Sequence, residues 1–388
     1  MDSYDFIVIG GGMMGAPCAR YLAETGRSVA LVAAPEPEDV QSWTGPFGSH
    51  FDAARITRHV AADPDWALAS ARAIARYADL EARSGQRIFH ETGALMAGPT
   101  DGPLADWTRG FRQVAAGVPG ATMLDTAEVR ARLGLALPPG SIASYEATSG
   151  GWMDPRAMRQ ASQALAVQAG ATLYTQHARA RDDSTVTLAD GTRIGADHVI
   201  VATGPHAASD GLLPARPALK VWARTIAFAE LSEAEGARLA AMPSVIWAPE
   251  GWDHDLYMLP PVRYPDGKLY LKIGGQVDSP RIESAADMTA WFRSGGDAAV
   301  ADRLLAEMRA VLPGLTTVRT MPGPCAVVWS ATGYPYIERL SDRVTVLCGG
   351  NGASAKCGDE WGRLGAIAAT GGRLNGEGYA CDFRAVWA

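Results

Sequence analysis

The sequence has little of what zinc, nucleic-acid or membrane proteins require. Its five cysteines, at positions 18, 325, 348, 357 and 381, include no C-x-x-C pair, which argues against a metal site and favours a reduced, cytoplasmic setting. Basic residues are not in excess: the net charge is −7, so we expect no nucleic-acid surface. No apolar run is long enough to span a membrane, and the short, glycine-interrupted run near the acidic N-terminus argues against a signal peptide.

Internal repeats and low-complexity linkers are absent as well. The hydrophobic content of 47% is ordinary for a globular enzyme, and a length of 388 residues suggests two domains, which can be interleaved.

The N-terminal stretch from Tyr4 to Val32 reads as strand, glycine turn, helix and strand. Gly10, Gly12 and Gly15 satisfy G-x-G-x-x-G, in which the glycines permit a tight turn, close approach of a pyrophosphate, and helix packing on the strand. The helix predicted over residues 13–25 would direct its N-terminus at the phosphates. This context predicts a dinucleotide site, with FAD and NAD both open.

One part of that fingerprint is missing. The second strand ends in Leu31-Val32-Ala33-Ala34, where an acid that binds the ribose is expected, and the nearest acid is Glu36. Either Glu36 takes this role from a shifted loop, or backbone groups hold the ribose.

Further elements follow from local signals. We expect helices over residues 64–85, 125–133, 155–170 and 359–370, strands over 88–97, 198–204 and 343–348, and hairpins at Asp190-Gly191 and Asp266-Gly267. The strand over 198–204 ends in Ala202-Thr203-Gly204 and is either another sheet strand or a second passage of the chain by the cofactor.

Three segments carry concentrated charge or aromatic groups. Residues 48–59 hold two arginines and two histidines, either as a solvated basic loop or as a cluster facing an anion. Residues 268–273 alternate with period 2, and periodicity alone favours a solvated Lys272 unless its face lines a cavity. Tryptophan and tyrosine accumulate from residue 214 to 324, and such aromatics are more often core than substrate site.

At this point the residues resemble the monomeric sarcosine oxidase and N-methyltryptophan oxidase family, flavin amine oxidases of the glycine/D-amino acid oxidase superfamily. The resemblance covers nearly the whole chain, in the family's order and at close to its spacing. Its most specific parts are the N-terminal fingerprint, Gly48-Ser49-His50 with residues 55–59, the strand bearing Lys272, Cys325, and residues 349–356.

The resemblance implies FAD as the cofactor. Cys325 stands where the family attaches FAD through a thioether to the flavin 8α carbon, although a buried structural role is the commoner fate of a lone cysteine. The spacing from Cys325 to residues 335–338 matches the family and favours the link. The expected cofactor-binding residues are Gly10, Gly12, Met13, Met14, Gly15, Glu36, Ser49, Arg55, Ala202, Thr203, Gly204, Cys325, Gly349, Gly350, Gly352 and Lys356.

The resemblance also implies a catalytic site formed by Lys272, Arg55 and His50. Lys272 matches the lysine near flavin N5 that promotes the reaction with oxygen, where a fixed cation stabilises developing negative charge. Arg55 matches a second cation beside the ring. Arg58 and Lys356 match the pair that binds the substrate carboxylate.

Several positions depart from the family pattern. Phe51 and Gln276 each replace a histidine, Val327 replaces a tyrosine, and Ala33 replaces the ribose-binding acid. We therefore expect a substrate larger or more apolar than sarcosine, bound by Arg58, Lys356, Phe51, Gln276, Val327 and Tyr257. No obvious general base remains, so deprotonation of the amine would depend on the cationic field alone.

Together these features predict an α/β (α+β) protein with a discontinuous Rossmann-like FAD-binding domain (1–85, 146–213 and 325–388) and a substrate domain with an antiparallel sheet (86–145 and 214–324). The expected enzyme is a monomer that oxidises the C–N bond of a secondary amine or amino acid, with hydride transfer to flavin N5, imine hydrolysis and reoxidation by O₂ to hydrogen peroxide. The alternatives are an FAD-dependent dehydrogenase with a non-oxygen acceptor and a flavin-binding protein without turnover.

Overall fold

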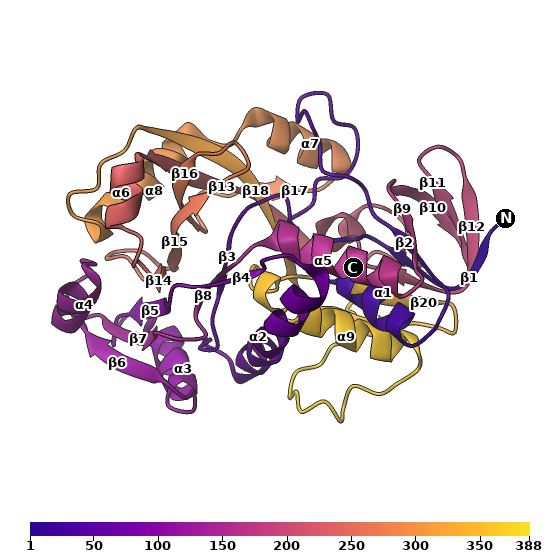
Figure 1. The fold of residues 1–388 in the computed structure, drawn as a ribbon, viewed down its shortest axis with the longest axis horizontal. Coiled ribbons are helices and arrows are strands. Elements are labelled where there is room, and N and C mark those ends of the chain that lie inside the picture. The colour runs from indigo at the N-terminus through magenta and orange to yellow at the C-terminus, as the bar shows by residue number, and fades with distance from the viewer.

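The N-terminal strand lies at the centre of an eight-stranded mixed sheet (Figure 1). A computed structural model describes residues 1–388, and in it β1 pairs in parallel with β2 on one side and with β12 on the other. The strand order is β10-β11-β12-β1-β2-β9, with β20 paired to β12 and β19 to β20. The strands are β1 (Ser3–Ile9), β2 (Val29–Val32), β9 (Thr172–Tyr174), β10 (Ala178–Asp182), β11 (Thr185–Leu188), β12 (Arg193–Val201), β19 (Tyr336–Arg339) and β20 (Val344–Cys348).

Four helices lie in the same half of the molecule as this sheet: α1 (Gly15–Glu24), α2 (Pro64–Ser84), α5 (Pro155–Gln168) and α9 (Gly358–Ala369). Helix α1 packs against both α5 and α9. Helix α2 begins after Asp63, whose side chain accepts hydrogen bonds from two backbone N–H groups, and it ends at Gly85 in the left-handed conformation. Both ends agree with the sequence prediction.

A second, nine-stranded sheet forms the other half of the molecule. Its order is β17-β13-β16-β15-β14-β5-β7-β6, with β18 paired to β13. The strands are β5 (Ala94–Gly98), β6 (Ala121–Asp125), β7 (Ile142–Glu146), β13 (Leu219–Leu231), β14 (Ser244–Trp247), β15 (Leu256–Arg263), β16 (Leu269–Gly275), β17 (Arg281–Ile282) and β18 (Arg319–Ser330). Its helices are α3 (Ala105–Ala115), α4 (Thr126–Leu133), α6 (Glu233–Arg238), α7 (Ala285–Ser294) and α8 (Ala298–Val311). The predicted antiparallel sheet is thus present, with one parallel pair, β5 and β14.

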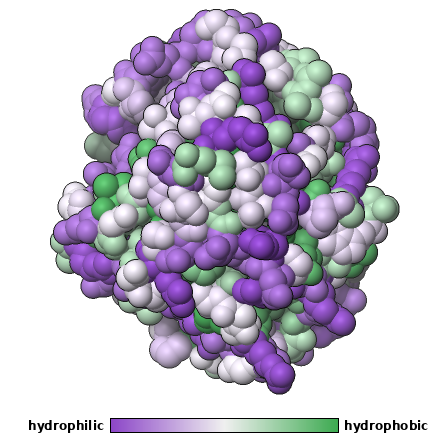
Figure 2. Space-filling view, turned by 90° about the vertical axis from the view of Figure 1, so that its right-hand side faces the viewer, coloured by the Kyte–Doolittle hydropathy of each residue, from purple (hydrophilic) through white to green (hydrophobic).

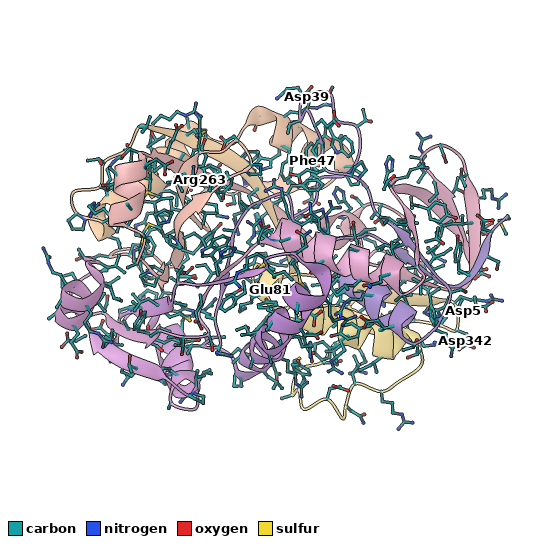
Figure 3. The ribbon with its side chains drawn as sticks, viewed as in Figure 1. Asp5, Asp39, Phe47, Glu81, Arg263 and Asp342 are labelled. Carbon is teal, nitrogen blue, oxygen red and sulfur yellow. The ribbon has the colours of Figure 1, made fainter.

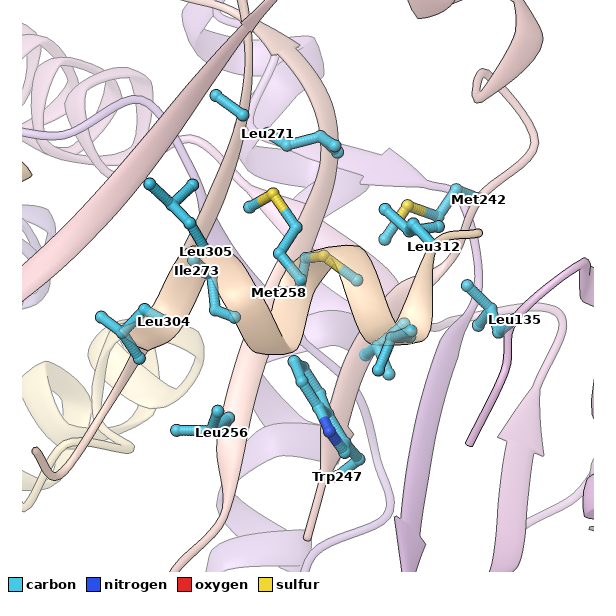
Figure 4. Packing of buried hydrophobic residues seen from close by; sticks show 14 of the residues in the cluster. Leu135, Met242, Trp247, Leu256, Met258, Leu271, Ile273, Leu304, Leu305 and Leu312 are labelled. Atoms are coloured by element: carbon cyan, nitrogen blue, oxygen red, sulfur yellow. The ribbon is translucent and has the colours of Figure 1, made fainter. Parts of the chain in front are cut away.

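Helix α8 closes the core of the second half. Its Leu304 and Leu305 join Leu271 and Ile273 of β16 and Trp247 of β14 in a buried cluster of 26 residues (Figure 4). Since burying an aliphatic side chain contributes about 1.5–3 kcal/mol, this cluster holds the helix against the sheet.

The predicted strand over 88–97 is wrong as a single element. It divides into β4 (Phe89–Glu91), which joins β3 (Arg55–Thr57) and β8 (Gly151–Met153) in a three-stranded sheet, and β5 of the large sheet. The break falls at Gly93, whose φ of +81° is a conformation that favours glycine. The chain changes sheets there, which periodicity could not reveal.

The boundary predicted between residues 324 and 325 falls inside an unbroken strand. Strand β18 pairs with β13 from Arg319 to Ser330. One buried cluster contains Ile7 and Val199 from the first sheet together with Val221 and Val328 from the second. The two halves therefore share part of their core.

Two short 3-10 helices follow strands of the first sheet. The first, η1 (Gly204–Ala208), follows β12, and the second, η2 (Ala355–Cys357), lies between β20 and α9. No helix has the length and apolar character needed to cross a bilayer. On the face in Figure 2, polar residues predominate and apolar ones occur singly or in small groups.

Candidate active site

A cavity of about 810 Å³ lies between the two large sheets. Its volume falls within the range of small-molecule and cofactor sites. Twenty of the residues singled out from the sequence line it: Gly10, Gly12, Met13, Met14, Ser49, His50, Phe51, Arg55, Arg58, Ala202, Thr203, Gly204, Tyr257, Gln276, Cys325, Val327, Gly349, Gly350, Gly352 and Lys356. Gly15, Glu36 and Lys272 do not line it.

The glycine loop has the shape that a dinucleotide requires. A Cβ on Gly10 would lie 2.3 Å from the Ala202 carbonyl oxygen, and one on Gly15 would lie 1.8 Å from the Gly10 carbonyl oxygen, so both positions exclude other residues. Gly12 faces the cavity, and the nearest atom to a Cβ there would be His50 Nδ1 at 3.3 Å. No side chain caps the N-terminus of α1, and its first turn has no acid. These features suit a bound pyrophosphate.

Glu36 does not line the cavity and pairs with an arginine instead. Arg156 of α5 binds it through Nε, at 3.0 and 2.8 Å, and through Nη2 at 2.5 Å. Ala34, and not Glu36, contributes to the cavity wall. This arrangement favours the alternative in which backbone groups bind the ribose.

Near this end of the cavity, the loop that precedes Gly48 is held against α7. Phe47, which is labelled in Figure 3, lines the cavity and stacks on Phe292 with ring centroids 4.5 Å apart. The stacking fixes the loop that leads into the charged segment 48–59.

Arg58 and Lys356 are two cations that face the cavity without a carboxylate partner. The Arg58 guanidinium donates from Nε to Met96 Sδ at 3.0 Å, and the Lys356 ammonium donates to the Ala353 carbonyl oxygen at 3.0 Å. Burial lowers the pKa of Arg58 and brings that of Lys356 to about 8. Buried cations are expensive unless they are paired, so this pair is suited to binding an anionic ligand.

His50 is buried and neutral. Burial holds the pKa of its imidazole well below the ordinary value, and Arg159, Arg156 and Arg55 lower it further. Its Nε2 has no hydrogen-bond partner in the protein. The ring of Phe51 lies edge-on to it, with centroids 4.4 Å apart. The ring lines the cavity, while its unpartnered Nε2 is covered by protein atoms, since a Cβ on Gly48 would lie 2.9 Å from it.

Lys272 is not solvated, contrary to what periodicity alone favours. Its side chain is 1% exposed, and its Nζ donates to Asp52 Oδ2 at 2.5 Å and to the Ala54 carbonyl oxygen at 2.6 Å. Arg55, which lines the cavity, also pairs with Asp52. Asp52 thus joins two predicted cations. The sequence reasoning missed it, although it is the only acid in the charged segment 48–59.

The remaining predicted residues converge from the second sheet. Cys325 lies on β18 opposite Arg224 of β13, and Trp291 donates from Nε1 to its carbonyl oxygen at 2.7 Å. Burial raises the pKa of Tyr257. Gly274 leaves room for this ring, since a Cβ there would lie 2.5 Å from the tyrosine hydroxyl. Gln276 accepts a hydrogen bond from Arg224 Nη2 at 3.3 Å.

Comparison with known proteins defines the family. Residues 5–366 match the DAO family, described as FAD dependent oxidoreductase. The chain belongs to the DAO family of FAD-dependent oxidoreductases. This assignment confirms the resemblance deduced from the sequence, and of the two cofactors that the fingerprint left open it selects FAD.

Curated relatives of this DAO-family chain are of modest identity. It is 27% identical over 326 residues to the N-methyl-L-tryptophan oxidase of Yersinia pestis (strain Pestoides F), which covers 80% of each protein. It is 30% identical over 229 residues to the enzyme of that name from Citrobacter koseri, covering 57% of this chain and 59% of that one. The match to monomeric sarcosine oxidase of Bacillus sp. (strain NS-129) is 33% identical but spans only 26% of this chain and 24% of that protein.

Solved structures share the DAO-family fold over the whole chain. NikD, described as an unusual amino acid oxidase essential for nikkomycin biosynthesis, superposes with a TM-score of 0.75 at 22% identity, covering 100% of this chain and 98% of NikD. Iminodiacetate oxidase from Chelativorans sp. BNC1 gives a TM-score of 0.70 at 22% identity, covering 95% and 97%. At these identities the likeness concerns the fold alone.

The sequence reasoning missed part of the cavity wall. Met96, Trp107 and Ile246 line it as apolar groups, and Asp255 lines it as a carboxylate. Asp255 precedes β15 and lies two residues before Tyr257, so period-2 alternation places both side chains on one face of the extended chain. That alternation was the available signal.

Proposed function

We propose that this FAD-dependent oxidoreductase is an amine oxidase that acts on the C–N bond of a secondary amine or amino acid bearing a carboxylate, as a cytoplasmic monomer. The observation that carries the proposal is the pair Arg58 and Lys356, two cations in one cavity with the glycine loop and with no carboxylate contact of their own. Two relatives are named as an N-methyl-L-tryptophan oxidase and an amino acid oxidase, and these names support an amine that bears a carboxylate as the substrate.

Each residue has a defined task in this proposal. Arg58 orients the substrate carboxylate by its planar fork, and Lys356 adds a point charge. FAD, when bound, accepts a hydride from the carbon beside the amine nitrogen and passes the electrons to O₂, which yields hydrogen peroxide. Lys272 and Arg55 keep positive charge near the site where negative charge develops in the reaction with oxygen. His50 contributes its neutral ring to the cavity wall beside Gly12 of the glycine loop.

The cofactor is proposed to be covalently attached through Cys325. The cysteine lines the cavity and is not part of a disulfide. Attachment would make FAD binding less dependent on any single polar contact. This would account for the lack of a ribose-binding acid, since Glu36 pairs with Arg156 instead.

The proposed substrate is larger or more apolar than sarcosine. Phe51 and Val327 line the cavity where the family carries polar side chains, and Met96, Trp107 and Ile246 extend the apolar wall. A panel of N-methyl, cyclic and aromatic amino acids, including sarcosine, would establish this preference.

The deciding experiment is anaerobic mixing of the purified flavoprotein with this panel, followed by admission of air. Bleaching of the flavin absorbance and formation of one hydrogen peroxide per turnover are expected. Bleaching without peroxide, with electrons passing to an artificial acceptor, would identify a dehydrogenase instead. A flavin that no amine bleaches would contradict the proposed function and favour a flavin-binding protein without turnover.

A further inference from the structure

Three carboxylates line the cavity, and two of them have protein partners. Asp63 caps α2 through Oδ1 and accepts a hydrogen bond from the Tyr334 hydroxyl through Oδ2 at 2.7 Å. Asp210 accepts from the Thr203 hydroxyl at 2.5 Å and from the Leu212 backbone N–H at 3.0 Å. Asp255 is the third, and apart from its own backbone N–H it has no hydrogen-bond donor in the protein.

Asp255 and Arg58 act on one another without an ion-pair contact. Each influences the other electrostatically, yet the guanidinium donates to Met96 Sδ and not to the carboxylate. Oppositely charged groups that face one cavity and stay apart leave room for a ligand that carries both charges. In an α-amino acid the amine nitrogen is two bonds from the carboxylate carbon, so an anion bound at Arg58 and Lys356 brings its ammonium group close by.

We propose that Asp255 binds the protonated amine of a zwitterionic substrate and takes its proton before oxidation. This inference rests on the proposed function and deepens it, because Asp255 supplies the general base that the sequence analysis did not find. One N–H bond of the ammonium breaks, one O–H bond forms on the Asp255 carboxylate, and the nitrogen regains its lone pair. That lone pair forms the C=N bond when the hydride leaves the neighbouring carbon for the cofactor.

The electrostatic surroundings agree with this assignment. Burial raises the pKa of Asp255, while Arg58 and His254 lower it. A raised pKa brings a carboxylate nearer to the range in which it both accepts and releases a proton at neutral pH. Lys356 lines the same cavity.

The first test is the pH profile of kcat/KM for Asp255→Asn, measured with the panel substrate that bleaches the wild-type flavin fastest. A loss of about 10²-fold at pH 7 is expected, since general bases typically contribute 10²–10⁴-fold. The loss should disappear above the pKa of the substrate's own amine, where no base is needed, and Asp255→Glu should retain part of the activity. A loss that is equal at all pH values, or no loss, would overturn the inference.

The second test needs no turnover. Betaine carries a carboxylate and a fixed cation, and 3,3-dimethylbutanoate has the same shape without the cation, so each can be titrated against the flavin absorbance. Wild-type protein should prefer betaine, and Asp255→Asn should reduce the preference by about tenfold or more, the usual scale for a partly buried charged contact. Equal affinity of the wild-type protein for both probes would contradict the inference.

Asp253→Asn is the matched control. It removes a carboxylate two residues away that is 85% exposed and pairs with His254, so both measurements should stay at wild-type values. The role of Asp255 and the proposed function can be contradicted separately. If amines reduce the flavin of the wild-type protein but Asp255→Asn has no effect, only the role of Asp255 is wrong. If no amine reduces the flavin, the proposed function is wrong.

Discussion

The Lys272 ammonium lies 2.5 Å from the Asp52 carboxylate, and both side chains are buried. Burial holds the pKa of this lysine well below its ordinary value, and the neighbouring Arg55 lowers it further. Asp52 also pairs with Arg55 and accepts a hydrogen bond from the Tyr264 hydroxyl at 2.8 Å. A single carboxylate therefore orients two cations, one of which, Arg55, lines the cavity.

Replacing this lysine should separate the two halves of the catalytic cycle. Lys272→Met is expected to slow reoxidation of the reduced flavin by about 10²-fold, because removing a preorganised charge-stabilising group commonly costs 10²–10³-fold. Reduction by substrate should change far less. Stopped-flow measurement of each half-reaction provides the comparison, and equal effects on both would remove the proposed role.

Lys268→Met is the control for that variant. Lys268 lies immediately before β16 and four residues before Lys272, so period-2 alternation places both side chains on one face. Its side chain, however, is 44% exposed and pairs with Glu230 at the surface. Its removal should leave both half-reactions unchanged.

Substrate affinity should weaken at alkaline pH through Lys356. Its pKa is about 8, so the ammonium is charged below this pH and loses its proton as the pH rises through it. KM for a carboxylate-bearing substrate should therefore rise between about pH 7 and 9, in the window set by this pKa. In Lys356→Met, KM should be raised at neutral pH and should lack this dependence, so that the values for the two proteins converge above the pKa of the lysine. An unchanged KM would mean that the substrate has no carboxylate at this position.

Acid precipitation tests the attachment of the cofactor. The yellow colour should stay with the wild-type protein and separate from Cys325→Ser, because only a covalent link survives unfolding. Cys381→Ser, which changes another half-buried free cysteine, should behave as wild type. Release of the colour from wild-type protein would show that the link is absent, and unchanged tight binding in Cys325→Ser would show that the tether does not compensate for the missing ribose-binding acid.

A buried charge network makes stability depend on acid pH. Burial opposes ionisation of Glu360, but hydrogen bonds from Arg363 and Arg76 outweigh it and lower its pKa from 4.5 to about 2. A carboxylate with a lowered pKa contributes stability above pH 4.5 and loses it as the pH falls toward 2; the contribution at neutral pH is about 3 kcal/mol.

Glu360→Gln should therefore lower the melting temperature at pH 7 by several degrees, and the difference from wild type should shrink below pH 4.5. Glu377→Gln, which removes a 24% exposed partner of Arg363 and Arg72, should have a much smaller effect. A difference between Glu360→Gln and wild type that is independent of pH would exclude this account of the network.

Local signals in the sequence predicted a large part of the structure. The caps Asp63 and Asp154, the glycine fingerprint and the two hairpins depend on neighbouring residues, and each is present. The burial of Lys272 could not be predicted, because period 2 tells which side chains share a face and not what covers that face. Asp52 meets Lys272 across 220 residues of chain, and such pairing is decided only by tertiary packing.

Asp255 was missed for a related reason. A carboxylate after an exposed loop normally faces water, and only its period-2 relation to Tyr257 indicates that it shares the cavity-facing side of the chain. The break at Gly93 was missed because both flanking segments have strand character, so only the change of sheet reveals it.

Strand β18 has a consequence for how the protein unfolds. It carries Cys325 and is paired along its length with β13, whereas Gly12 follows the central strand of the other sheet. A cofactor that touches both positions bridges the two halves, so its binding free energy stabilises their joint arrangement. Scanning calorimetry should therefore show a transition of the loaded protein at a higher temperature than that of protein prepared without flavin.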